Sequence, residues 1–142
     1  MSDSTFSEQD QRSQMKPIPP SENIAPFLEL HWGLKVCKIK QIESYDDANF
    51  YCETQQVGSD CIVPYLVKFY NAFDTIKPDF LYGLSHMLDA INQRVASGIE
   101  VPSIISPCSG GDPTGINFVF FLDCPLINGK SSKVAVRVFK WI

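Results

Sequence analysis

The fold is decided by a run of apolar and aromatic residues in the middle of the chain, Cys61-Ile62-Val63-Pro64-Tyr65-Leu66-Val67-Lys68-Phe69-Tyr70. β-branched and aromatic side chains dominate this run, which is typical of a β-strand. Pro64 is expected to mark where ladder pairing begins, because proline has no N–H to donate to a neighbouring strand. Side chains alternate across a strand, so Lys68 should share one face with Leu66 and Tyr70.

Lys68 is unusual because apolar side chains surround it. One interpretation is structural: the aliphatic stem lies along a strand edge and the ammonium group reaches water. The other is functional: a cation is held in a cleft to meet nucleotide phosphates, as the lysine on the third strand of kinases does. Residue types alone favour the structural interpretation, and both remain open at this point.

A short helix is expected before this strand, from about Asn23 to Trp32. Its apolar residues recur at helical spacing, and Gly33 is suited to end it. Pro26 is expected in the first turn, where its missing N–H has no helical partner to lose. The residues that should form its buried face are Ile24, Phe27, Leu28 and Trp32.

The remaining pattern predicts an α+β fold with short antiparallel connections. A long helix is expected over residues 77–97, with Pro78 near its start and Gly98 just past its end. Asn128-Gly129 is typical of a hairpin turn. About five strands are expected to form an antiparallel sheet, and they lie at residues 34–42, 49–57, 61–70, 116–122 and 133–139.

Composition limits the possible partners. The 142 residues fit one domain, and the net charge of −4 comes without a basic cluster, so nucleic acid is not an expected partner. Neither a signal peptide nor a membrane-spanning run is recognisable, which makes the cytoplasm the expected location. Residues 1–16 are rich in Ser, Gln and Asp, with Phe6 as the only aromatic residue, and are expected to form a disordered tail.

The sequence offers little for metal binding or for a P-loop. Its five cysteines form no C-x-x-C pair and are expected to be reduced and mostly buried, and with only two histidines no metal site is expected. Gly129-Lys130-Ser131 resembles the end of a P-loop. However, Cys124 stands where the first glycine is needed, and a strand rather than a helix should follow the serine.

The order of elements, taken with three motifs, resembles the aminoglycoside phosphotransferase and choline kinase-like superfamily over residues 17–142. The chain is most similar to the hydroxylysine kinase-like branch, which has a comparable turn and a comparable lysine-bearing strand. This resemblance implies a protein-kinase-like N-terminal lobe that binds nucleotide and is truncated at the hinge. The motifs are Ser44-Tyr45-Asp46-Asp47-Ala48-Asn49-Phe50, Tyr65-Leu66-Val67-Lys68 and Val136-Arg137-Val138-Phe139.

The resemblance also implies roles for individual residues. Lys68 would contact the α- and β-phosphates of GTP or ATP bound with Mg²⁺. Tyr82 stands where the family has a glutamate that pairs with the lysine, so Lys68 is expected to lack that acidic partner. Residues of the loop above the nucleotide would be Ser44, Tyr45, Asp46 and Asn49, and those of the hinge beside the base would be Phe139 and Trp141.

The implied activity of the complete protein is GTP-dependent phosphorylation of 5-hydroxylysine. The catalytic and metal-binding residues of the superfamily lie in a second lobe, so this chain alone is expected to be inactive. One alternative is a non-catalytic interaction module whose exposed face, including Tyr82, Phe139 and Trp141, is covered by a protein partner. A second alternative is an unrelated α+β protein that shares these motifs by chance.

Overall fold

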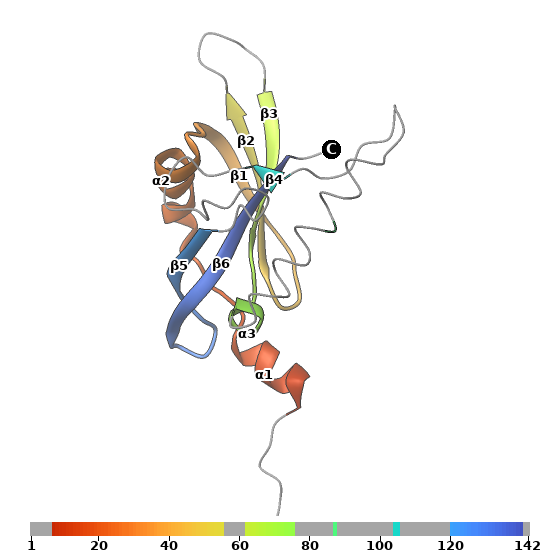
Figure 1. Cartoon of the computed structure of the whole chain (residues 1–142). Coiled ribbons are helices and arrows are strands. Elements are labelled where there is room, and N and C mark those ends of the chain that lie inside the picture. Colours follow the sequence, from red (N-terminus) through yellow and green to blue (C-terminus); the bar gives the residue numbers. More distant parts are fainter. Residues whose placement is uncertain (1–6, 56–61, 76–86, 88–103, 106–119, 141–142) are drawn as a thin grey trace, which may run out of the picture.

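A computed structural model describes residues 7–55, 62–75, 87, 104–105 and 120–140 (Figure 1). The long helix expected over residues 77–97 falls outside the described residues except at Met87, and Tyr82 and Trp141 also fall outside them. In the described part of the chain no helix is long and apolar enough to cross a membrane.

The described residues form an antiparallel sheet with few helices, which confirms the α+β class. The sheet has five strands of six or more residues and the two-residue strand β4. The strand order is β1-β2-β3-β6-β4, and β5 pairs with another part of β6. The strands are β1 (Val36–Ile42), β2 (Ala48–Gln55), β3 (Ile62–Phe69), β4 (Ile104–Ile105), β5 (Phe120–Pro125) and β6 (Ser131–Lys140).

Helix α2 (Ser21–Trp32) is the expected short N-terminal helix and lies against one side of the sheet (Figure 1). It ends as predicted, because Gly33 adopts the left-handed conformation with φ 66° and its N–H bonds back into the last turn. The expected position of Pro26 was wrong. The helix begins at Ser21, so Pro26 lies inside it, on the exposed side, where the Glu22 carbonyl can turn to water.

The main apolar core fills the space between α2 and one face of the sheet. Ile24, Leu28 and Trp32 of α2 are at most 4% exposed. They pack with alternate residues of the strands, which all point to the same face. The strand residues of this face that are at most 2% exposed are Ala48, Phe50, Cys52, Val67, Phe69, Cys124, Val134, Val136 and Val138.

Part of the tail that was expected to be disordered, residues 8–14, is helical. Helix α1 (Glu8–Gln14) begins with a capping box between Ser7 and Asp10. It contributes no buried residue, as expected from its few apolar side chains, so apolar burial does not hold this helix in place. Polar contacts hold it instead: Arg12 binds both carboxylate oxygens of Asp74, which lies in the short helix α3 (Ala72–Thr75), at 2.6–2.8 Å.

Two turn predictions can be compared with the structure. Gly129 has φ 85° in the β5–β6 hairpin, as an Asn-Gly turn requires, and strand β6 rather than a helix follows at Ser131. Pro64 lies inside β3, opposite Glu53 of β2, and pairing with β6 begins one residue later, at Tyr65. Pro64 therefore marks the start of pairing on the β6 side alone.

Candidate functional site

Lys68 lies on an inner strand of the sheet. Its direct cross-strand neighbours are Asn49 on β2 and Arg137 on β6. Val67 and Phe69 on either side of it are buried in the main core, so Lys68 points to the opposite face together with Tyr70. The name "Lys68 face" is used below for Asn49, Lys68, Tyr70 and Arg137. Because β3 is paired on both sides here, Lys68 does not lie at a strand edge.

The ammonium group of Lys68 has two partners in the described part of the chain. Its Nζ lies 3.3 Å from Oδ2 of Asp47 and 5.1 Å from the ring centroid of Tyr70. The side chain is 31% exposed and that of Asp47 20%, so water reaches one side of the ion pair. This geometry fixes the ammonium in place and leaves donor capacity on its open side.

Arg137 was not singled out as a site residue from the sequence, although it belongs to a motif that carried the resemblance. It is fully buried, its Nη1 donates to the Tyr70 hydroxyl at 3.2 Å, and its guanidinium lies 5.4 Å from the same ring. Tyr70 thus contacts both cations of the Lys68 face. The sequence did contain a signal for this residue: in β6 a charged residue stands between two valines of the core, which marks a cation on the opposite face of an inner strand.

The turn between β1 and β2 lies beside Lys68, and its two carboxylates face cations. Asp46 Oδ2 is 3.9 Å from Arg12 Nε, and Asp47 pairs with Lys68. Tyr45 is 79% exposed, and the Ser44 carbonyl accepts from Lys16 Nζ at 2.7 Å. Of the expected loop residues, Asn49 lies closest to Lys68 in the sheet, whereas the contact with Lys68 itself comes from Asp47, which the prediction omitted.

Asn71 connects the turn to the end of β3 and was not predicted from the sequence. It is fully buried, and its backbone N–H donates to Oδ1 of Asp47 at 2.8 Å. Its side-chain amide donates to the carbonyls of Arg12 and Asp46 at 2.8 and 2.9 Å, while its Oδ1 accepts from the Phe73 N–H. A short polar side chain two residues after a strand is common in turns, so the sequence gave little signal for this role.

The expected hinge residues are placed only in part. Phe139 lies on the same face as Arg137, two residues further along β6, and is paired with Leu66 and Ile104. It is 9% exposed, so it offers little surface to a protein partner. Trp141 lies outside the described residues, and with it the rest of the expected contact to a purine base.

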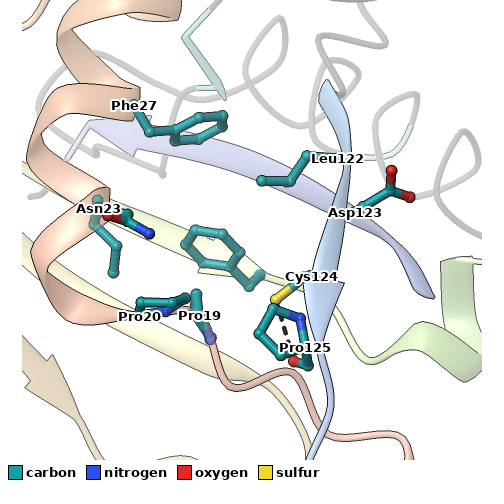
Figure 2. Close-up of a pocket in the computed structure, with 10 residues that line it drawn as sticks. Pro19, Pro20, Asn23, Phe27, Leu122, Asp123, Cys124 and Pro125 are labelled. Atoms are coloured by element: carbon teal, nitrogen blue, oxygen red, sulfur yellow. Dashed lines mark hydrogen bonds between the residues drawn. The ribbon is translucent and has the colours of Figure 1, made fainter. Parts of the chain in front are cut away.

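A hollow of about 250 Å³ lies on the other face of the sheet, between α2 and β5 (Figure 2). Phe69 forms part of its wall, and this side chain points away from the Lys68 face. None of the predicted site residues lines it. The lining residues are Pro19, Pro20, Asn23, Ile24, Phe27, Phe69, Leu122, Asp123, Cys124 and Pro125.

Two of the three described cysteines, Cys52 and Cys124, are buried. Burial raises the pKa of the Cys52 thiol to about 12 and that of Cys124 to about 11, whereas Cys37 is exposed. Two of the three therefore follow the expectation of buried thiols. Among the residues that the structure places, no three His, Cys, Asp or Glu side chains cluster as a metal site.

Comparison of the chain with protein-family models, with curated proteins and with solved structures finds no match. Function is therefore inferred from the residues of the Lys68 face, their surroundings and the motifs quoted above.

Proposed function

We propose that the Lys68 face binds the phosphates of a nucleoside triphosphate, GTP or ATP with Mg²⁺, in a kinase-like lobe of the hydroxylysine kinase type. One observation carries this proposal: a partly exposed lysine is held on an inner strand by Asp47 and Tyr70, next to the turn between β1 and β2. These two contacts hold the ammonium group in one place, where an anion can approach its exposed side.

The chemistry of the face suits an anion. The Lys68 ammonium has three N–H donors, of which Asp47 takes one, so others can reach a phosphate oxygen from the open side. Arg137 adds a second positive charge one strand away, in a buried position where the local dielectric is low. A phosphate at Lys68 would thus contact that ammonium group, with the Asp47 carboxylate beside it and the buried Arg137 one strand away.

Asp47 can take the role of the glutamate that Tyr82 replaces. In the hydroxylysine kinase-like family a helix glutamate is expected to orient the lysine, and here Asp47 makes the carboxylate contact from the turn, at 3.3 Å. A charge-assisted contact from this turn can orient Lys68 as well as one from a helix. In the wider proposal, the acceptor in the complete protein is the side-chain hydroxyl of 5-hydroxylysine.

Equilibrium dialysis of the full chain against labelled GTP and ATP, with and without Mg²⁺, tests the proposal. Lys68→Met should weaken nucleotide binding about tenfold or more, because it removes a charged hydrogen-bond donor and keeps the stem. Lys40→Met is the matched control, since Lys40 is an exposed lysine of β1 in the same sheet. Equal affinities of the two variants, or no binding by the unaltered chain, would refute the proposed function.

A further inference from the structure

The segment that precedes α2 crosses the end of the sheet next to the turn that carries Asp46 and Asp47. Figure 1 shows α1 and α3 together at this end. Lys16 Nζ donates to the Ser44 carbonyl, and the Met15 carbonyl accepts from the Ala72 N–H at 3.1 Å. The same segment also reaches the β5–β6 hairpin, where Ile127 N–H donates to the Lys16 carbonyl at 2.9 Å.

Arg12 holds α1 against this end of the sheet. Its guanidinium binds both oxygens of Asp74, and the two side chains are 21% and 12% exposed. A bidentate pair with this much burial is stronger and more directional than a typical surface pair. Asp46 lies on the other side of the same guanidinium, with Oδ2 at 3.9 Å from Nε.

Asn71 joins Arg12 to Asp47. One side-chain amide nitrogen donates to the Arg12 and Asp46 carbonyls, and the backbone N–H of the same residue donates to Asp47. Since Asn71 is fully buried, none of these groups could turn to water without loss of hydrogen bonding. A shift of α1 would therefore move the Asn71 side chain, and with it the turn whose carboxylate holds Lys68.

We propose that Asn71 is a positioning residue of the Lys68 face, through which docking of α1 by Arg12 sets the place of Asp47 and the anion affinity of Lys68. This inference rests on the proposed function for its effect on binding. The coupling of α1 to the turn itself can be measured without any ligand, so the two can fail separately.

Arg12→Met is the main variant, because it removes the contacts to Asp46 and Asp74 without opening the core. Lys133→Met is the matched control: it makes the same charge change in an exposed pair, Lys133–Asp123, with atoms 3.8 Å apart and side chains 65% and 78% exposed. Asn71→Ala is the second variant, and it is interpreted only if its circular dichroism spectrum matches that of the unaltered chain.

The first measurement is amide hydrogen exchange of residues 44–50. Arg12→Met and Asn71→Ala should speed this exchange about tenfold, because the turn loses contacts that fix it, while Lys133→Met leaves it unchanged. The second measurement is the Kd for inorganic tripolyphosphate. It should rise about two- to thirtyfold in Arg12→Met and Asn71→Ala and stay unchanged in Lys133→Met. Faster exchange with unchanged affinity, or unchanged exchange, would overturn the proposal.

A third measurement separates this inference from the proposed function. Reductive ¹³C-methylation labels Lys68, and its NMR signal is assigned by its loss in Lys68→Arg. If the unaltered chain does not bind tripolyphosphate, a change of this signal in Arg12→Met still supports the positioning role and refutes the nucleotide site. An unchanged signal refutes the positioning role as well.

Discussion

The two faces of the central strands are built on opposite principles. On one face, Phe50, Val67 and Phe69 pack under α2, and their apolar side chains need no hydrogen-bond partner. On the other, Lys68 and Arg137 lie side by side on the adjacent strands β3 and β6. Asp47 contacts Lys68, and Tyr70 contacts both cations. The same strands present both faces, because alternate residues point in opposite directions.

The contrast assigns different tasks to the two faces. Burial of apolar side chains is the main favourable term in folding, so the face under α2 supplies most of the stability of the sheet. A buried cation such as Arg137 costs free energy unless its donors and its charge are satisfied. On this face Arg137 is held by Tyr70, whose hydroxyl accepts from its guanidinium, so polar contacts organise the face that apolar packing organises under α2.

The largest effect should come from the apolar face. Phe50→Ala leaves a cavity next to Phe69, whose ring centroid is 5.8 Å away, and should lower the free energy of unfolding by about 3–5 kcal/mol. Urea unfolding followed by circular dichroism measures this. Tyr45→Ala, in the exposed turn, should change it by less than about 0.5 kcal/mol. A loss below about 1 kcal/mol for Phe50→Ala would contradict the assignment of stability to this face.

A smaller effect is expected on the polar face. Tyr70→Phe removes the hydroxyl that accepts from Arg137 and keeps the ring, so a buried donor loses one partner, at a cost of about 1–2 kcal/mol. The control is Tyr51→Phe, since the Tyr51 hydroxyl donates to Glu53 at 2.8 Å where both side chains reach water. Equal unfolding free energies of the two variants would show that the Arg137 contact contributes nothing.

Much of this contrast could be predicted from the sequence, because it depends on local patterns. The alternation around Lys68 predicted that Val67 and Phe69 point to the opposite face, and in the structure that face is the core. Gly33 and the Asn128-Gly129 pair ended a helix and closed a hairpin as expected, because both need positive φ angles that glycine adopts at low cost.

The contacts that organise the Lys68 face could not be predicted in the same way. Asn71 meets Asp47 across 24 positions of the sequence and Arg12 across 59. No periodicity reports such distant pairings, which follow from the sheet register and from the path of the chain before α2. The acidic partner of Lys68 was sought on the helix around Tyr82, whereas among the described residues it comes from the turn. The helix α1 was missed because ion pairs rather than apolar residues hold it.

The smallest effect tests the apolar face at a single buried thiol, Cys52. Burial raises its pKa from 9.0 to about 12 in the folded chain, whereas in the unfolded chain the thiol ionises near its ordinary value. Below pH 9 the thiol is protonated in both states and has no effect on stability. Above pH 9 the unfolded state alone loses the proton, so the free energy of unfolding should fall as pH rises.

For Cys52 this loss amounts to about 1 kcal/mol between pH 9 and pH 10. Urea unfolding of the unaltered chain and of Cys52→Ala at both pH values isolates the thiol from lysines and tyrosines that titrate in the same range. The variant is less stable at pH 9 because it leaves a small cavity, and its stability should fall less steeply. Parallel slopes would mean that water reaches Cys52, and the core face would then be less tightly closed than its 0% exposure indicates.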